Sequence, residues 1–512
     1  MPTSCPCHGP EDPFDGAYAA NKLEELKEFE LHEEDAEGWL YRGEGSANIV
    51  LAYHGRRPSF IGRVLRLRKA SKKDDGTQNQ VKKEPKPVLS EEEAKLWREW
   101  PNMSKATTSA ALAHVFACEV MQPLLGEDHV DAGLLVFLTT GFLEAVSRDV
   151  LAKQREWRRN DSKMDMTAGV ALLITDHSLF PIVPGRVKDL PQTITIEIKP
   201  KWGYLPDAAT ISEENSVKRH VTRFAMHQHL KLQQGKIKTM SKYCPLDLFS
   251  GNVEGIHKAL VQMFETPQNN IRIFLKGVEI FGGPEDGGST NELMVALEEK
   301  LGAVMVAPEG ERVLIFQRLV ASVLNKSKVL DQLLRLQKLD TYAIEGANLA
   351  YSKFTGMTDD AGADDESEAG SEEVGAEIDS RPVSTVGFGR VCIENLALEP
   401  EDTQKKRDKA WIKSLSWEES RCVVRNFLIA ATAKDCGIML TLRPLYNEHG
   451  TPFSVPSASV ATCPTTGQQY VSKIAFLDLD TKRLKKIPVY YSLDQQIVDT
   501  YKACSQQLAK LL

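Results

Sequence analysis

The sequence predicts an α+β protein with a smaller, strand-rich N-terminal part and a larger, mixed C-terminal part. Apolar residues alternate along short segments such as 49–53 and 192–199, which is the period of a half-buried strand. Other segments, such as 217–232 and 493–511, carry apolar residues at helical spacing. The 512 residues are 42% hydrophobic, which is sufficient for a core in one large bilobal fold or in two to three domains.

Strands dominate the first part of the chain. Residues 39–53 predict two strands around a glycine turn, and residues 60–67 predict a third strand after Pro58. A basic and polar loop is expected at 68–92. Short helices are expected before and after this loop, at 21–31, 90–100 and 106–121.

Strands and helices mix in the remainder of the chain. Strands are predicted at 192–199, 271–275, 438–442 and 473–479. Helices are predicted at 217–232, 313–338, 417–433 and 493–511. The second part therefore combines both kinds of element, as expected of an α+β fold.

An acidic segment interrupts the second part. Residues 359–379 contain ten Asp or Glu residues and no Lys or Arg. Such a segment cannot bury enough apolar surface to offset the entropy of ordering, so we expect a disordered insert at 356–385. The net charge of −8 becomes +2 without those ten acids, so the rest of the chain is slightly basic. This balance does not indicate a nucleic-acid partner, but it allows a locally basic pocket for a small polyanion.

The expected compartment follows from the N-terminus, the hydropathy and the cysteines. Glu11, Asp12 and Asp15 lie where a secretory signal would have a basic region. No apolar run approaches the roughly 18 residues that a membrane helix needs. Nine scattered cysteines without a C-x-x-C pair are typical of reduced thiols. We therefore expect a cytoplasmic and/or nuclear protein without a membrane span.

A glycine-rich turn lies between the two strands predicted at 39–53. Gly43, Gly45 and Asn48 stand where backbone N–H groups can approach a phosphate closely, because glycine has no Cβ. The next strand carries Arg66 where protein kinases keep a phosphate-pairing lysine. These features are typical of an ATP site, although an ordinary hairpin turn and a solvated edge-strand arginine explain them as well.

The strand predicted at 192–199 ends in charged residues. Its isoleucines share one face, so Glu197 and Lys199 project together from the other face. Pro200 ends the strand and places Lys201 at its mouth. The two lysines can clamp phosphate groups, and the carboxylate can bind a ribose hydroxyl. Alternating solvated charges are the other interpretation.

A row of basic side chains is predicted on the helix at 217–232. Arg223, His227 and Lys231 are four residues apart, so the helix aligns them on one face. Three cationic or proton-bearing groups in one row suit a polyphosphate. A lone helix histidine is often structural, so His227 keeps that second interpretation.

Two aspartates stand near predicted strand ends. Asp435 lies at a helix-to-strand junction, and Asp478 lies in the strand at 473–479. Magnesium takes hard oxygen ligands such as a carboxylate, and a second carboxylate can take the proton of an attacking hydroxyl. The basic cluster that begins at Lys482 then becomes a candidate for holding substrate phosphates. Solvated or capping aspartates and a solvated basic surface are the alternatives.

Seven segments together resemble the inositol-pentakisphosphate 2-kinase family, and most closely its plant members. They occur in the family's order, at 41–48, 197–203, 223–228, 245–251, 266–270, 429–436 and 476–479. The resemblance implies a bilobal inositol-phosphate kinase fold with ATP in the inter-lobe cleft. It places a partly disordered extension at 1–31, an N-lobe with the glycine-rich loop at 32–185 and a C-lobe with the inositol phosphate site at 186–512.

The resemblance also implies a reaction and the residues for it. With ATP and Mg²⁺, the 2-hydroxyl of inositol 1,3,4,5,6-pentakisphosphate would be phosphorylated to give inositol hexakisphosphate (phytate). ATP would be bound by Gly43, Gly45, Asn48, Arg66, Asp176 and Glu197. The substrate would be bound by Lys199, Lys201, His227, Lys231, Asn269, Asn270, Lys482, Lys486 and Tyr490. Catalysis would depend on Asp435 as base or orienting group, on Lys199 and on Asp478, which would hold magnesium. The expected partner is this small molecule, and the expected state is a monomer.

The sequence departs from the family pattern at three places. Leu135 replaces an arginine that binds a substrate phosphate in plant members, and Lys486 replaces an arginine fork by a point charge. The acidic segment occupies the region where plant members hold zinc around a C-x-x-C pair, so no structural zinc is predicted. Because Leu135 removes one N-lobe contact, we expect the N-lobe to be held loosely until substrate binds.

Two other functions stay open at the level of sequence. One is a kinase that acts on a less phosphorylated inositol. The other is a non-catalytic polyphosphate-binding scaffold, although the presence of Lys199, Asp435 and Asp478 argues against it.

Overall fold

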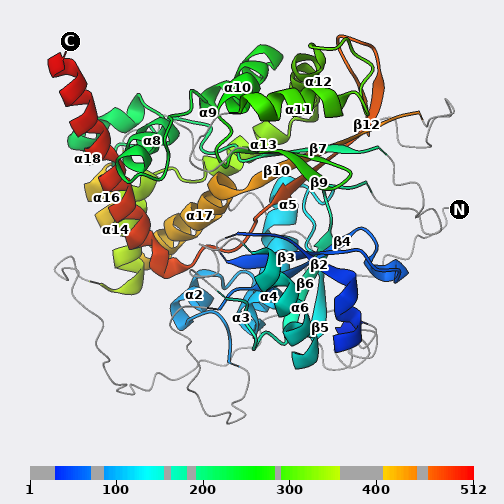
Figure 1. Ribbon diagram of the computed structural model, residues 1–512. Coiled ribbons are helices and arrows are strands. Elements are labelled where there is room, and N and C mark those ends of the chain that lie inside the picture. Colours follow the sequence, from blue (N-terminus) through cyan, green and yellow to red (C-terminus); the bar gives the residue numbers. More distant parts are fainter. Residues whose placement is uncertain are drawn as a thin grey trace, which may run out of the picture.

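The computed structural model describes residues 29–45, 47–70, 86–154, 163–180, 192–282, 290–357, 407–446 and 459–511. Within these ranges the chain forms two six-stranded sheets that are accompanied by many helices (Figure 1). The predicted α+β class is confirmed. Residues 1–28 and nearly all of the acidic insert predicted at 356–385 lie outside the described residues.

The first sheet has the strand order β1-β5-β6-β4-β3-β2. Its strands are β1 (Glu30–Leu31), β2 (Trp39–Glu44), β3 (Asn48–Tyr53), β4 (Arg63–Arg68), β5 (Leu134–Leu138) and β6 (Val170–Thr175). Only the β1–β5 pair among these is parallel. Alternate residues such as Ile49, Leu65 and Leu173 are buried in a core with Phe142 of α6 (Thr140–Lys153). The opposite face of the sheet carries Arg66.

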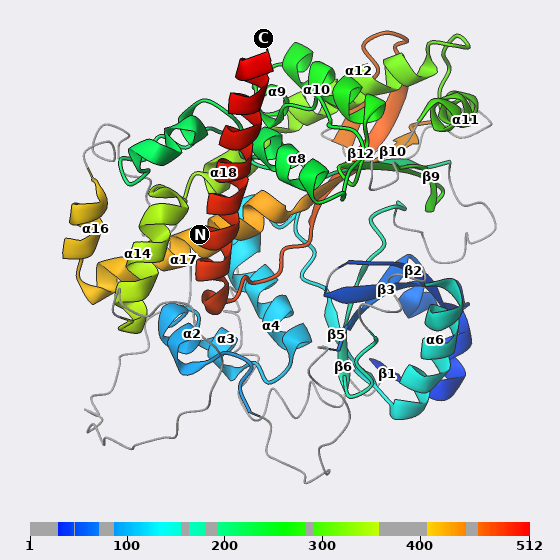
Figure 2. The same ribbon diagram turned by 60° about the vertical axis from the view of Figure 1, so that its left-hand side comes forward.

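A helical segment that follows β4 packs with the second part of the molecule. It consists of α2 (Glu91–Leu96), α3 (Pro101–Lys105), α4 (Ser109–Phe116), the π-helical turn η4 (Ala117–Met121) and α5 (Gln122–Leu125). Ser90 begins α2 with a capping box, in which Ser90 and Glu93 each accept the other's backbone N–H. Leu96, Phe116 and Leu125 are buried in the same core as β7 and β10. Figure 2 shows these helices beside α17, away from α6.

The second sheet is antiparallel throughout, with the order β11-β12-β10-β7-β8-β9. Its strands are β7 (Ile194–Ile198), β8 (Ile271–Leu275), β9 (Val278–Gly282), β10 (Gly437–Pro444), β11 (Val460–Thr462) and β12 (Gln469–Leu477). Ile194, Ile196 and Ile198 are buried in its core, so Glu197 points to the other face as predicted.

Helices surround the second sheet. They are α8 (Arg223–Gln233), α9 (Pro245–Leu248), α10 (Val253–Glu265), α11 (Asn291–Leu301), α12 (Arg312–Ser327), α13 (Val329–Gln337), α14 (Ala343–Thr355), α16 (Lys409–Ser414), α17 (Trp417–Asp435) and α18 (Ile487–Leu511). Short 3₁₀ helices are η2 (Glu33–Gly38), η3 (Pro58–Phe60), η5 (Glu213–Arg219) and η8 (Leu484–Lys486). Within the described ranges, every helix is too short or too polar to cross a membrane.

Two of the predicted helices are divided in the structure. The helix predicted at 313–338 is broken at Lys328, which has a left-handed φ of 60°. The helix predicted at 217–232 is divided between the end of η5 and α8. Thr222 caps the start of α8 by accepting the N–H of Ala225 at 3.2 Å. The sequence patterns did not predict the following elements: β1, β5, β6, β9, β11, α6, α10, α11 and α14.

Candidate active site

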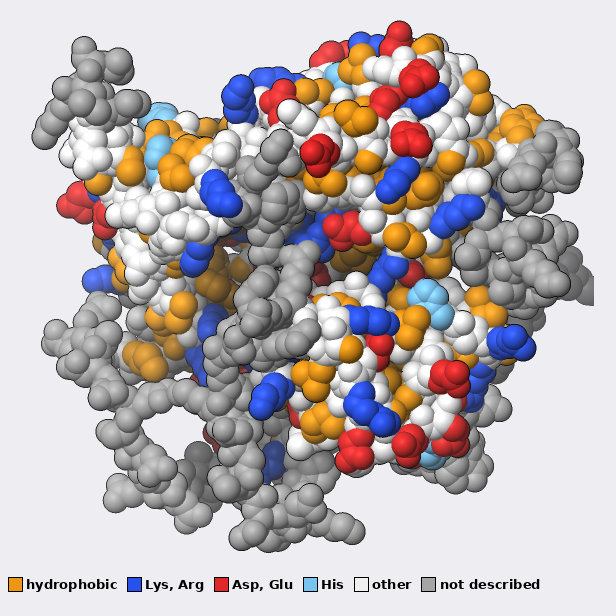
Figure 3. Space-filling view, viewed as in Figure 1, with side chains coloured by type: hydrophobic (Ala, Val, Ile, Leu, Met, Phe, Trp, Pro, Cys, Tyr) orange, Lys and Arg blue, Asp and Glu red, His pale blue; other side chains and the backbone are white. Residues whose placement is uncertain are grey.

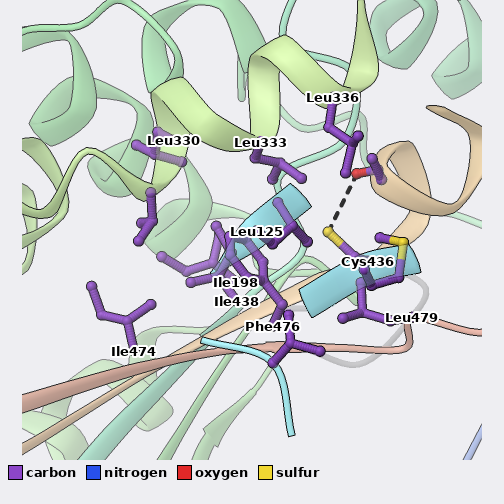
Figure 4. Close-up of a cluster of buried hydrophobic side chains, with 14 of the residues drawn as sticks. Leu125, Ile198, Leu330, Leu333, Leu336, Cys436, Ile438, Ile474, Phe476 and Leu479 are labelled. Atoms are coloured by element: carbon purple, nitrogen blue, oxygen red, sulfur yellow. Dashed lines mark hydrogen bonds between the residues drawn. The ribbon is translucent and has the colours of Figure 1, made fainter. Parts of the chain in front are cut away.

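The segment that follows β12 turns two aspartates away from the core. Leu479 is buried with Cys436, Ile438 and Phe476 beneath α13, as Figure 4 shows. Leu479 is buried, whereas the carboxylates of Asp478 and Asp480 on either side of it reach the surface. Asp478 has a left-handed φ of 60°, a conformation that aspartate tolerates better than most residues.

Asp480 connects this segment to the first sheet. Its carboxylate forms an ion pair with Arg66 on β4. Asn48 on β3 lies beside the same guanidinium, and with its amide oxygen turned inward it accepts from Nε at 3.2 Å and from Nη2 at 2.6 Å. Two residues predicted to bind ATP are therefore tied to the segment predicted to hold the metal.

Lys199 connects the end of β7 to the same segment. Its Nζ lies 3.6 Å from Oδ2 of Asp478, and that aspartate side chain is 55% exposed. The backbone N–H of Lys199 donates to the carbonyl oxygen of Asn270 at 2.8 Å. The side-chain amide of Asn270 is buried and has no hydrogen-bond partner among the described residues, while Asn269 beside it is half-buried. A buried amide without a partner is unfavourable, so a polar ligand that reaches Asn270 would be stabilised there.

A basic pocket adjoins this segment. Five Lys or Arg residues and two carboxylates line it, together with a histidine and several aromatic rings; the charged and histidine residues are Lys201, Arg223, His227, Lys231, Lys434, Asp435, Lys482 and Asp494. They come from the turn after β7, from α8, α17 and α18, and from the segment after β12. Figure 3 shows a recess between the two halves of the molecule with Lys or Arg side chains at its rim. Cations that are far apart in the sequence thus converge on one pocket.

Burial, reinforced by neighbouring cations, lowers the pKa of two groups in the pocket. Burial lowers the pKa of Lys201 to about 8, and Lys199 and Lys231 add to the effect. Burial, followed by Arg223 and Lys231, lowers the pKa of His227 to about 3. His227 is therefore a neutral imidazole in the free protein, and Lys201 loses its proton at a pH only slightly above neutrality.

Asp435 is the last residue of α17 and lies at the edge of the pocket. Its Oδ2 is 2.5 Å from Nζ of Lys482, and its side chain is 68% exposed. Burial alone would lower the pKa of Lys482, but the Asp435 carboxylate outweighs that effect and raises it. The next residue, Cys436, is buried in the core and donates its Sγ–H to the carbonyl of Ala433 (Figure 4). Asp435 therefore has a fixed anchor and an open carboxylate.

Buried ion pairs hold the pocket walls in place. Asp494 on α18 accepts from Lys218 at 2.6 Å and from Nε of Arg223 at 3.3 Å. Glu345 on α14 accepts from the same Lys218 at 2.9 Å. The Arg223 guanidinium also lies 5.0 Å from the ring centre of Trp202. Arg223 is therefore oriented both by a carboxylate and by an aromatic ring.

A second buried pair supports α17 next to Asp435. Nζ of Lys434 lies 2.5 Å from Asp340 and 4.0 Å from the ring centre of Trp202. Burial lowers the pKa of Lys434, while Asp340 opposes the change. This pair joins α17 to the turn after α13.

The glycine-rich loop is open at its tip and anchored at its base. Apart from the adjacent chain residues, no atom of the described residues lies within 4 Å of the place that a Cβ would occupy at Gly43 or Gly45. Glu44 between them forms a buried ion pair with Lys69 and accepts from Nε2 of Gln154 at 3.1 and 3.0 Å. The loop therefore leaves room for a ligand while its base stays fixed.

Asp176 and Glu197, the two acids predicted to line the nucleotide site, lie in different environments. Asp176 follows β6 and is buried. Its Oδ1 accepts the backbone N–H of Ser178 at 2.9 Å and the Ser178 hydroxyl at 2.5 Å. Glu197 lies on β7 opposite Arg272 of β8. Burial raises the pKa of Glu197, although Arg272 and Lys199 oppose the shift. One oxygen of Asp176 is thus already engaged in a turn.

The structure gathers most of the predicted site residues into two neighbouring sets. One surrounds the segment after β12 and contains Asn48, Arg66, Lys199 and Asp478. The other lines the basic pocket and contains Lys201, His227, Lys231, Asp435, Lys482 and Tyr490. Lys486 lies exposed on η8 and does not line the pocket.

Sequence patterns did not identify three other residues of the pocket lining as site residues. They are Trp202, Lys434 and Asp494. Arg223 lies in the lining together with His227 and Lys231, as the predicted row on one helix face requires. Lys434 and Asp494 have no sequence signal, since their partners are far away in the chain.

The described residues contain no cluster of three or more His, Cys, Asp or Glu side chains that could hold a metal on its own. Magnesium does not require one, because it usually takes one or two carboxylates together with phosphate oxygens and water. The exposed carboxylate of Asp478 meets that requirement. The acidic segment 359–379, where no structural zinc is predicted, lies outside the described residues.

Comparisons with known proteins agree with the resemblance seen in the sequence motifs. The family described as inositol-pentakisphosphate 2-kinase matches residues 41–496. The chain is similar to the inositol-pentakisphosphate 2-kinase of Arabidopsis thaliana, with 36% identity over 92% of this chain and 94% of the relative. It is 38% identical to the protein of that name from Oryza sativa subsp. indica, over 92% of this chain and 95% of the relative. It is 28% identical to the inositol-pentakisphosphate 2-kinase of Danio rerio, over 93% of this chain and 95% of the relative.

Proposed function

The chain belongs to the inositol-pentakisphosphate 2-kinase family, and on this premise we propose that it is an ATP-dependent kinase of inositol 1,3,4,5,6-pentakisphosphate. The reaction transfers the γ-phosphoryl group of ATP to the 2-hydroxyl and gives inositol hexakisphosphate. The observation that carries the proposal is the basic pocket, which lies directly beside Asp435 and close to Asp478. The two sheets then belong to two lobes, with ATP between them.

The charge of the pocket matches the charge of the substrate. Five phosphate groups bring roughly ten negative charges. The pocket lining offers five Lys or Arg residues against two carboxylates, and Asp494 is already engaged by Lys218 and Arg223. Lys201 and His227 are held below their ordinary pKa values in the free protein. A bound polyanion would raise both values, so these residues bind substrate and protons together.

Asp435 and Lys199 act on the reacting groups. The Asp435 carboxylate orients the attacking hydroxyl and accepts its proton. In the free protein this carboxylate is paired with Lys482, and a substrate phosphate would draw that lysine away and release it. Lys199 lies on the other side, next to Asp478, where it neutralises charge on the transferred phosphoryl group.

Asp478 is the residue that would hold magnesium. Its carboxylate is exposed and lies at the strand end between the first sheet and the basic pocket. When bound, the ion neutralises charge on the phosphates of ATP. Lys199 would exchange its contact with Asp478 for a phosphate oxygen at the same time.

The nucleotide side of the site is formed by the first sheet and the start of the second. Gly43 and Gly45 leave open space above the triphosphate, and Arg66 supplies a guanidinium for it. Arg66 must first leave Asp480. Asp176 in the connection between the sheets and Glu197 on β7 contact the nucleoside, and the raised pKa of Glu197 suits a hydrogen bond to a ribose hydroxyl.

One turnover experiment tests this function. Purified protein is incubated with γ-labelled ATP, magnesium and inositol pentakisphosphate, and the product is separated from other inositol phosphates. Label in inositol hexakisphosphate supports the proposal. Faster labelling of a less phosphorylated inositol would replace it by the second kinase function, and binding without labelling would replace it by a scaffold.

A further inference from the structure

Arg68, the last residue of β4, lies on the same face of the first sheet as Arg66. Strand residues two positions apart share a face, and the buried face of β4 is formed by Leu65 and Leu67. Across the sheet, Arg66 is level with Leu172 of β6, which is level with Leu135 of β5. Leu135 therefore occupies the face that carries the two arginines, and it contributes no charge there.

A pocket opens in front of these arginines. Its polar and charged lining includes Asn48, Arg66, Arg68, Ser109, Asp165 and Asp480. Arg66 is engaged by Asp480, whereas Arg68 is exposed and makes no side-chain hydrogen bond or ion pair within the described part of the chain. Asp165 also lines this pocket but forms no ion pair with Arg68 within the described residues; its Oδ1 accepts the N–H of Thr167 at 2.9 Å and the Thr167 hydroxyl at 2.6 Å.

The direction of β4 separates the roles of the two arginines. Arg63 at the start of the strand donates to Thr175 at 3.2 Å, next to Asp176, where the nucleoside is expected. Arg66 follows in the middle of the strand, at the place of the triphosphate. Arg68 lies about 7 Å beyond Arg66, because a strand advances about 3.3 Å per residue. With the triphosphate at Arg66, as proposed above, Arg68 would lie beyond it along the strand, on the side of the phosphoryl acceptor.

We propose that Arg68 binds a phosphate group of the inositol acceptor and is a specificity-determining residue on the N-lobe. The proposal rests on the proposed function. The segment that presents Asp480 to this pocket presents Lys482 to the basic pocket, so both pockets adjoin the same short stretch of chain. Arg68 offers a planar fork that matches a phosphate, and within the described residues no side-chain partner competes for it. It supplies from β4 the positive charge that Leu135 does not supply from β5.

The first experiment compares Arg68→Gln with Arg56→Gln. Arg56 is an exposed arginine between β3 and β4, outside both pockets, so it controls for the loss of one surface charge. The affinity for inositol pentakisphosphate is measured by calorimetry without ATP, and KM is measured for both substrates. Arg68→Gln is expected to weaken binding and raise KM for the inositol phosphate by at least about tenfold, with KM for ATP changed less than about twofold. Arg56→Gln is expected to behave as wild type.

The second experiment identifies the contact. Inositol tetrakisphosphates that each lack one phosphate are tested as ligands of wild type and of Arg68→Gln. One of them is expected to show no further loss in Arg68→Gln, because the phosphate that Arg68 binds is already missing. Adding Leu135→Arg to Arg68→Gln is expected to recover at least part of the lost affinity, since Leu135 shares the face.

Three results would overturn the assignment. Equal affinities of Arg68→Gln and Arg56→Gln would exclude a role for Arg68 while leaving the kinase function intact. A rise in KM for ATP alone would assign Arg68 to the nucleotide. A wild-type protein that neither binds nor phosphorylates inositol pentakisphosphate would overturn the proposed function and this inference with it.

Discussion

Replacing Lys201 by methionine is expected to stabilise the free protein and to weaken substrate binding. Burial beside Lys199 and Lys231 lowers the pKa of Lys201 to about 8 from an ordinary value of 10.5. A shift of that size corresponds to about 3 kcal/mol of unfavourable free energy for the charged lysine in the folded state. Methionine keeps most of the apolar stem and removes this cost, so the Lys201→Met variant should have the higher melting temperature at neutral pH.

The lowered pKa of Lys201 also makes its contribution to stability depend on pH. Below about pH 8 both the folded and the unfolded chain hold the proton, and the full cost is present. Between about pH 8 and 10.5 the unfolded chain holds a proton that the folded chain has released, so the contribution of Lys201 to stability rises with pH. The difference in melting temperature between Lys201→Met and wild type should therefore shrink as the pH is raised through this window.

Substrate binding should show the opposite trend. A bound polyanion restores the pKa of Lys201 toward its ordinary value, so binding takes up a proton above about pH 8. The affinity of wild type for inositol pentakisphosphate should fall about twentyfold from about pH 7.5 to 9.5 through this residue. Lys201→Arg keeps its charge throughout and controls for titration of the ligand. Calorimetry in two buffers of different ionisation enthalpy counts the protons taken up.

Two results would contradict a lowered pKa of Lys201 in the free protein. One is a parallel loss of affinity with pH in wild type and Lys201→Arg. The other is a Lys201→Met variant that melts no higher than wild type at neutral pH.

Three further predictions concern the supports of the site. Asp478→Asn should lower kcat by at least about a thousandfold, because it removes the carboxylate proposed to hold magnesium. The melting temperature should change little, because asparagine also tolerates a φ of 60°. Full activity of this variant would exclude Asp478 as the magnesium ligand. Glu93→Gln should raise KM for the inositol phosphate and lower the free energy of unfolding by about 1–3 kcal/mol, since Glu93 accepts from Arg483 at 2.9 Å and from the N–H of Leu484 at 3.1 Å. An unchanged KM in steady-state kinetics would show that Glu93 does not position the basic cluster that begins at Lys482. Lys434→Met should lower the free energy of unfolding in denaturant by about 3–5 kcal/mol, because it leaves Asp340 buried without its ion-pair partner. The double variant with Asp340→Leu should recover most of that loss, and an equally unstable double variant would contradict the electrostatic explanation.

Local patterns predicted much of the fold. The alternation of Ile194, Ile196 and Ile198 identified β7 and the face of Glu197, because one-sided burial imposes a period of two. The break between α12 and α13 was not predicted, since apolar residues continue at helical spacing through Lys328. The capping residue Thr222 was a usable signal for the start of α8.

The site was predictable where residues share one element and not where they meet across the fold. Arg223, His227 and Lys231 lie on one helix, and the structure places all three on the wall of one pocket. The pairs of Arg66 with Asp480 and of Lys434 with Asp340 join residues far apart in the chain. Only the packing of β4 against the segment after β12, and of α17 against the turn after α13, creates these contacts. Motif spacing contains no information about them.

The proposed function is tested most directly by the position of the phosphate that the protein adds to inositol pentakisphosphate in the presence of ATP and magnesium. We predict one new phosphate on the 2-hydroxyl, made by wild type and by Arg56→Gln and lost in Asp435→Asn. Phosphorylation of a different hydroxyl, or unchanged product formation by Asp435→Asn, would show that Asp435 and the surrounding cations do not orient the reacting group.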